Sequence, residues 1–166
     1  IRVCCFSKVQ DNMLMWSHYA DKHTGICLEF DLLEDSTNVF RSLFPVKYTN
    51  IRESCNYIRD ADSYIKCFAL TKSIDWSYEK EWRILFNDEI FLRSALKIGE
   101  KYFLKLPKPS AIYLGKRIDS ENKRKIFDIC KKREISLYQM EKDTREAKLY
   151  EIEILKYSEK NFEDEI

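Results

Sequence analysis

All the histidines and tryptophans of this 166-residue chain fall within two short segments. Residues 15–23 contain Trp16 and both histidines, His18 and His23, and residues 76–83 contain the other two tryptophans. An imidazole can move a proton or hold a ligand near neutral pH, and an indole face can stack on an aromatic ring. We therefore expect the two segments to meet around a shared site.

The second segment places carboxylates beside an arginine. If residues 79–86 are extended, the two-residue period of a strand puts Glu79, Glu81 and Arg83 on one side and the apolar residues on the other. A carboxylate on a rigid strand beside an arginine can polarise a substrate or bind an ion. Taken alone, the pattern also fits an exposed ion pair that contributes about 0–1 kcal/mol.

Other chemistries lack their usual spacing. His18 and His23 are five residues apart and project about 140° apart on a helix, so they form no metal-binding pair. Ser7 and Ser17 lack the Gly-x-Ser-x-Gly context of a nucleophile. A histidine on a half-buried helix more often serves packing than catalysis. The six cysteines contain no Cys-x-x-Cys, so we interpret them as small buried residues in a reducing cytoplasm.

The elements that must position these segments follow from hydrophobic periodicity. Helices are expected over residues 13–23, 54–73 and from Asp119 or Ser120 to about Arg133. A buried strand is expected over residues 1–6. Further strands are expected over residues 26–31, 43–48, 81–86, 102–106, 111–114, 137–140 and 149–155. The pattern indicates one α+β domain over residues 1–157, with a mixed or mostly antiparallel sheet, several packed helices and a frayed polar tail at 158–166.

The charge and hydrophobicity of the chain disfavour a membrane or a nucleic acid as its partner. The formal net charge is +1, and the apolar runs are far shorter than the roughly 20 residues of a membrane helix. We expect no membrane association and a cytoplasmic location. A basic stretch at 116–133 is read as a solvated helix face, and nucleic-acid binding through it is the less favoured alternative.

Several spaced blocks resemble a known family. The blocks are Cys5-Phe6-Ser7, residues 14–20 and 23–31, Val46-Lys47-Tyr48 with Lys72 and residues 76–83, and finally residues 111–115. Together they are similar to the uncharacterised bacterial and phage domain-of-unknown-function family 2971, over roughly Val3 to Leu155. Members of that family usually carry an earlier block, so we expect this chain to be an N-terminally incomplete fragment.

The resemblance implies a function only by analogy. The family's layout is similar to that of ADP-ribosyltransferase-like domains, in which a late Glu-x-Glu strand helps frame a nicotinamide dinucleotide. Glu79 and Glu81 would correspond to that strand, and Glu81 is the preferred carboxylate. Tyr19 or Trp16 would stack on nicotinamide, and His18 would act as a polar clamp. NAD is then the expected substrate, and the protein a transferase or a dinucleotide-cleaving enzyme.

The enzyme hypothesis rests on one set of residues, and two alternatives stand beside it. The candidate catalytic residues are Glu81, Glu79 and His18, and the candidate substrate-binding residues are Trp16, Tyr19, His23, Lys72, Trp76, Arg83 and Ser7. One alternative is a non-catalytic module of a defence or toxin system, such as phage defence, that binds a nucleotide or a peptide. Another is nucleic-acid binding or cleavage through the basic helix at 116–133.

Overall fold

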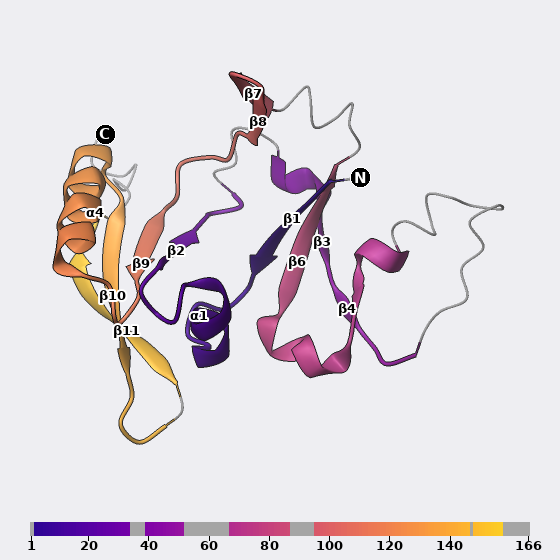
Figure 1. The fold of residues 1–166 in the computed structure, drawn as a ribbon, viewed down its shortest axis with the longest axis horizontal. Helices are drawn as coiled ribbons and strands as arrows, with labels where there is room; N and C mark the ends of the chain where they lie inside the picture. Colours follow the sequence, from indigo (N-terminus) through magenta and orange to yellow (C-terminus); the bar gives the residue numbers. More distant parts are fainter. Residues whose placement is uncertain (1, 34–38, 52–66, 87–94, 147, 158–166) are drawn as a thin grey trace, which may run out of the picture. The chain divides into compact units, whose positions relative to one another are not determined.

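The computed structural model describes residues 2–33, 39–51, 67–86, 95–146 and 148–157, and it confirms the predicted α+β class (Figure 1). Its contacts divide the chain into two compact units. Unit 1 comprises Ile1–Val9 and Leu32–Pro107, and unit 2 comprises Gln10–Asp31 and Lys108–Ile166. The prediction of one domain over residues 1–157 stays a prediction.

Unit 1 is built on an antiparallel sheet with strand order β1-β6-β3. Its strands are β1 (Arg2–Ser7), β3 (Leu43–Pro45) and β6 (Glu81–Phe86). Ile84 and Phe86 of the central strand are buried, as the two-residue period predicted. Pro45 lies on an edge strand, where its missing N–H interrupts no ladder. The residues of β1 are exposed or partly exposed, so the prediction that this strand is buried was wrong.

Shorter elements complete unit 1. They are η1 (Val39–Ser42), β4 (Lys47–Tyr48), β5 (Thr71–Lys72), η2 (Ile74–Glu79), β7 (Ala95–Ile98) and β8 (Lys101–Leu104). The strand predicted over 43–48 is in fact two strands, because β3 pairs with β6 while β4 pairs in parallel with β5. The β7–β8 hairpin turns at Gly99, whose φ of +61° favours glycine. Sequence periodicity missed β7.

Unit 2 is built on a mixed sheet that contains one βαβ connection. A mixed sheet is one of the two kinds that the sequence predicted. The strand order is β11-β10-β9-β2, with β2 (Ile26–Glu29), β9 (Ala111–Leu114), β10 (Ser136–Lys142) and β11 (Leu149–Leu155). Strands β9 and β10 are parallel and are joined through helix α4 (Ser120–Arg133), whereas the other pairs are antiparallel. Helix α4 starts at its Asp119 cap, as predicted.

Every residue of β9 is buried because both faces of this strand are covered. Ala111 and Tyr113 pack with Trp16 of helix α1 (Met13–Tyr19), on one face. Ile112 and Leu114 pack on the other face in a cluster that includes Cys130 of α4. The two helices therefore cover opposite faces of the sheet (Figure 1), and α1 places Trp16 in the core of unit 2.

Helix α1 is four residues shorter than predicted. It begins after Asn12, whose side chain accepts from the amides of Leu14 and Met15, and it ends at Tyr19. Residues 21–23 that follow adopt positive φ angles of 43°, 54° and 72°. A right-handed helix cannot continue through this left-handed turn, so the predicted end at His23 was wrong.

Some predictions fall outside the described residues: most of the helix over 54–73, the tail at 158–166, and Cys55. Within the described part of the former range, Thr71–Lys72 is a strand rather than a helix. Among the described cysteines, Cys130 is buried and Cys5 is exposed, so the prediction of uniformly buried cysteines was wrong. None of the described helices is long and apolar enough to cross a membrane.

Candidate functional site

Lys72 of unit 1 lies between two buried carboxylates. Glu79 and Glu81 are 3% and 6% exposed. The Lys72 ammonium donates to Oε2 of Glu79, and its Nζ also lies 3.0 Å from Oε2 of Glu81. Buried carboxylates need such partners, because transferring an unpaired charge from water into the protein is costly. The structure thus brings together three of the residues that sequence reasoning selected.

The backbone that positions these three side chains contains a 3-10 helix and a left-handed turn, which the sequence did not predict. Glu79 is the last residue of the 3-10 helix η2, and Lys80 then adopts a left-handed φ of 44° before β6 begins at Glu81. The strand predicted over residues 81–86 is therefore confirmed, but the extended conformation considered for residues 79–86 does not hold at residues 79 and 80. The turn at Lys80 nevertheless directs both carboxylates to Lys72, which β5 supplies.

Arg83 completes the cluster from the same side of β6. Its Nε and Nη2 donate to the two oxygens of Glu81 at 2.7 and 2.9 Å, which is the bidentate geometry of a strong ion pair. Its Nη1 donates to the carbonyl of Ala69 at 2.6 Å. The amide of Glu81 donates to the hydroxyl of Tyr48 at 2.7 Å, which anchors the start of β6. We call Lys72, Glu79, Glu81 and Arg83 the polar cluster.

The contacts of the polar cluster shift the acidity of its members. Burial alone would raise the pKa of Glu81, but hydrogen bonds from Arg83, Cys5 and Lys72 outweigh it and lower this pKa to about 2. Burial would lower the pKa of Lys72, yet its bonds to Glu79 and Glu81 raise that pKa above the ordinary value. Desolvation, followed by the bond to Glu81, raises the pKa of the Cys5 thiol to about 11. Glu81 therefore stays ionised at neutral pH, and Cys5 stays a neutral thiol.

An aromatic side chain borders the polar cluster. The Lys72 ammonium lies 4.9 Å from the ring centroid of Trp76, within cation–π distance, and Trp76 is 38% exposed. Ser7, which was predicted to bind substrate, donates its hydroxyl to the carbonyl oxygen of Glu79 at 2.7 Å. In this structure Ser7 therefore holds the backbone of the site.

The predicted residues of the first segment lie in unit 2. His18 and Tyr19 are exposed on α1, with ring centroids 6.2 Å apart. Trp16 is 4% exposed, belongs to the core, and donates its indole N–H to the carbonyl of Gln10 at 2.5 Å. The expectation that Trp16 stacks on a ligand was wrong because the core covers its ring. Tyr19, which is 64% exposed, is the stacking candidate that remains on this helix.

His23 lies in the left-handed turn after α1. Its ring is nearly parallel to that of Trp16, with an interplanar angle of 8° and centroids 6.5 Å apart. Its Nε2 lies 3.1 Å from the hydroxyl oxygen of Ser17, a residue that the sequence pattern had set aside. The meeting of this segment with Glu81 around one shared site stays a prediction, since the two segments belong to different units.

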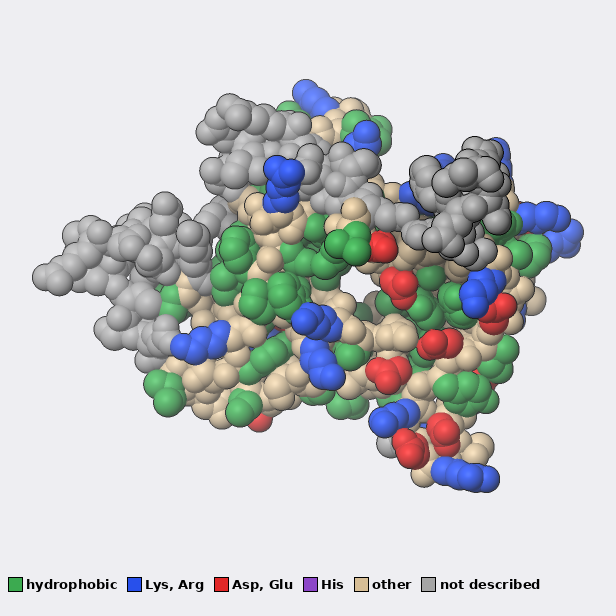
Figure 2. Space-filling model, turned by 180° about the vertical axis from the view of Figure 1, so that it is seen from behind, with side chains coloured by type: hydrophobic (Ala, Val, Ile, Leu, Met, Phe, Trp, Pro, Cys, Tyr) green, Lys and Arg blue, Asp and Glu red, His purple; other side chains and the backbone are tan. Residues whose placement is uncertain are grey.

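Several basic groups of the stretch 116–133 have partners within unit 2. Lys123 donates to Oε1 of Gln139 at 2.9 Å, Lys125 pairs with an acidic residue one turn earlier on α4, and Lys116 lies 3.4 Å from Glu141. On the face drawn in Figure 2, Lys and Arg side chains are dispersed among acidic and hydrophobic ones. Nucleic-acid binding through α4 stays a prediction.

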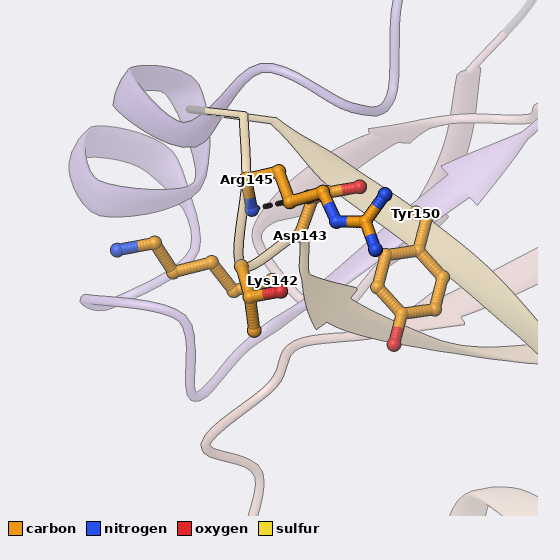
Figure 3. Close-up of a pocket in the computed structure, with 5 residues that line it drawn as sticks. Lys142, Asp143, Arg145 and Tyr150 are labelled. Atoms are coloured by element: carbon orange, nitrogen blue, oxygen red, sulfur yellow. Dashed lines mark hydrogen bonds between the residues drawn. The ribbon is translucent and has the colours of Figure 1, made fainter.

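A shallow hollow of about 320 Å³ opens at the turn between β10 and β11. It is lined by Lys142, Asp143, Thr144, Arg145 and Tyr150 (Figure 3). The Asp143 carboxylate accepts from the Arg145 amide at 2.6 Å and so shapes the turn. None of these residues was a sequence candidate, and the hollow contains no member of the polar cluster.

Comparison with known sequences confirms the resemblance that the motifs indicated. Residues 15–84 match the profile of the family described as "Protein of unknown function (DUF2971)". The match runs from α1 to β6 and so includes both segments that concentrate the titratable and aromatic residues. No curated protein and no solved structure matches the chain.

Proposed function

We propose that the polar cluster is the reactive centre of an enzyme of ADP-ribosyl-transfer or dinucleotide-cleaving type, with NAD as its substrate. The observation that carries the proposal is the pair of buried carboxylates, Glu79 and Glu81, on either side of Lys72 and next to the exposed ring of Trp76. Cleavage of the bond between nicotinamide and ribose develops positive charge on the sugar. An ionised carboxylate stabilises that charge, and a low pKa keeps Glu81 ionised throughout the reaction.

Each member of the cluster has a role in this proposal. Trp76 stacks on the nicotinamide ring once Lys72 has left it, because this partly exposed aromatic side chain borders the polar cluster. Lys72 is the most exposed of the four charged side chains. Its ammonium moves from the carboxylates to the pyrophosphate when the dinucleotide binds, which uncovers Glu79. Arg83 keeps its bidentate bonds and holds Glu81 in place.

Release of nicotinamide from NAD tests the proposal directly. Glu79→Gln and Glu81→Gln should each lower the rate at least 100-fold, since each removes a charge that the transition state needs. Glu100→Gln, an exposed carboxamide substitution in the same unit, should leave the rate unchanged. Far-UV circular dichroism checks that the variants fold. The proposal is overturned if the wild type neither binds NAD nor releases nicotinamide, or if both glutamine variants retain its rate.

A second candidate is a non-catalytic module that binds a nucleotide or a peptide. The observation that favours it is the saturation of Glu81, whose two oxygens already accept from Arg83 and Lys72. In this alternative, Glu81 holds the side chains of Lys72 and Arg83 in position to bind an anionic ligand, and Glu81 itself takes part in no reaction. Isothermal calorimetry distinguishes the candidates: NAD binding without any product, surviving Glu79→Gln, supports the module over the enzyme.

A further inference from the structure

Ser17 and His23 of unit 2 form a hydroxyl–imidazole pair. The Ser17 hydroxyl oxygen lies 3.1 Å from Nε2 of His23, which is hydrogen-bond distance. The same hydroxyl lies 3.0 Å from the carbonyl oxygen of Met13, one turn back on α1. Its single proton can therefore go to the carbonyl oxygen or to the imidazole. Ser17 is exposed and His23 partly exposed, so the pair can be reached from solvent.

The fold holds the imidazole of His23 in place from several directions. The backbone amide of His23 donates to the carbonyl of Trp16 at 3.2 Å, and the backbone carbonyl of His23 accepts from the amide of Arg117 at 2.9 Å. Its ring stacks on the buried ring of Trp16. The turn also packs so closely on β9 that a Cβ at Gly115 would lie 2.2 Å from the His23 carbonyl oxygen.

Left-handed backbone angles at three successive non-glycine residues, 21–23, are costly. They persist because the surrounding contacts impose them. Such strain is typical of sites where a side chain must be aimed. Here the side chain that the turn aims is the imidazole of His23, and its target is the Ser17 hydroxyl.

The charges around His23 keep its ring neutral. Burial lowers the pKa of His23, and the positive charges of Arg117 and Lys116 at the end of β9 lower it further. The acidic groups nearby are engaged elsewhere: Glu141 pairs with Lys116, and Asp21 accepts from Thr24. At neutral pH the imidazole therefore has a nitrogen lone pair that can accept a proton from Ser17.

We propose that Ser17 and His23 are a nucleophile–base pair that cleaves activated carboxylic esters. The Ser17 oxygen bonds to the acyl carbon while its proton passes to Nε2 of His23. The ester C–O bond then breaks, and the leaving alcohol takes that proton. In the second half, Nε2 takes a proton from water as the water oxygen bonds to the acyl carbon. The bond between the acyl carbon and Ser17 Oγ then breaks, the carboxylic acid leaves, and Nε2 returns its proton to Oγ. The positive charge of Arg117, which acts on His23, favours the oxyanion intermediate.

This reaction is separate from the one proposed for unit 1. The pair lies within Gln10–Asp31 of unit 2, whereas the polar cluster lies in unit 1. Either proposal can therefore fail while the other holds, and the two assays share no substrate.

A fluorophosphonate probe tests the pair on the whole chain. Attack forms an Oγ–P bond at Ser17 and breaks the P–F bond, so fluoride leaves and the serine proton goes to His23. Intact-mass measurement should show one adduct, and peptide mapping should place it at Ser17. Ser17→Ala should abolish the adduct, and Ser120→Ala, at another exposed serine of unit 2, should leave it unchanged. The same chain should release a stoichiometric burst of p-nitrophenolate from p-nitrophenyl acetate.

His23→Asn tests the base, because asparagine tolerates the left-handed backbone of this position. It should slow labelling at least 100-fold. In the wild type, the labelling rate should rise with pH as His23 loses its proton and level off by neutrality; this readout needs no variant. The pair is overturned if Ser17 is not labelled, if labelling spreads equally over the exposed serines, or if folded His23→Asn labels at the wild-type rate.

Discussion

Glu81 is the residue on which most of the polar cluster depends. It accepts from Arg83 at both oxygens and from Lys72 at one of them, and it is almost fully buried. Removing one member of a buried ion pair costs more than the pair itself contributes, because the remaining charge loses its partner. Glu81 therefore couples the stability of unit 1 to pH.

The stability of the protein should fall as the pH drops from 4.5 towards 2. The pKa of Glu81 is about 2 in the folded protein and 4.5 ordinarily, so the unfolded chain takes up its proton first. The stabilisation is thus fully present above pH 4.5 and is lost as the pH falls through the folded pKa. Glu81→Gln should lower the free energy of unfolding at pH 7 by about 3 kcal/mol and flatten this acid slope.

Urea unfolding at several pH values, followed by circular dichroism, measures both effects. Glu100→Gln serves as the matched control, because this exposed glutamate should keep the wild-type slope and stability. If Glu81→Gln instead has the acid slope and stability of the wild type, the ion pairs of Glu81 do not stabilise the folded state.

At the scale of elements, α1 is short and depends on its ends. Seven residues form few internal hydrogen bonds, so packing and capping must hold the helix. Trp16 packs it against the sheet of unit 2, and the left-handed turn at 21–23 stops it. At its start, Asn12 satisfies two amides that would otherwise lack intrahelical partners.

Asn12→Ala should therefore destabilise unit 2 by about 1 kcal/mol, the usual cost of losing a helix cap. Asn12→Asp keeps an acceptor oxygen at the same position and should retain most of the stability. Chemical unfolding of the two variants measures the difference. Equal stability of the alanine variant and the wild type would mean that packing alone holds α1.

At the scale of the molecule, the segment Leu32–Pro107 of unit 1 interrupts the sequence of unit 2 between β2 and β9. These two strands are antiparallel neighbours, with Glu29 opposite Ala111, and the amide of Ser110 donates to the Glu29 carbonyl at 2.9 Å. The end of β2 and the start of β9 are thus as close as two paired strands of a β-hairpin. A short turn can bridge such a gap.

Residues 10–31 joined to 108–157 through a short Gly-containing turn should fold on their own. The sheet, both of its hydrophobic clusters and the covering helices lie within these ranges. Well-dispersed amide resonances and a cooperative urea transition should identify the folded unit. The same segments with Leu114→Asp, which puts a charge at a fully buried site, should not fold. A collapsed chain without dispersed resonances in the unsubstituted version would show that unit 2 needs unit 1.

Sequence alone determined the features that depend on local signals. The bounds of β9, of β11 and of α4 with its Asp119 cap follow from periodicity and capping, which neighbouring residues specify. It also selected the members of the polar cluster, because titratable residues and tryptophans are concentrated in and beside residues 76–83. Their burial was not predicted, since the same pattern fits an exposed ion pair.

Tertiary structure decided the features that depend on distant partners. The early end of α1 is imposed by contacts between the turn at 21–23 and the loop after β9. Residues 43–48 divide because β3 and β4 find different neighbours. Glu79 reaches Lys72 from a 3-10 helix rather than a strand, and Ser17 meets His23 only through a left-handed turn. The first two outcomes depend on hydrogen bonds with residues remote in sequence. The last two join residues only seven and six positions apart, but they depend on turns that local periodicity does not encode.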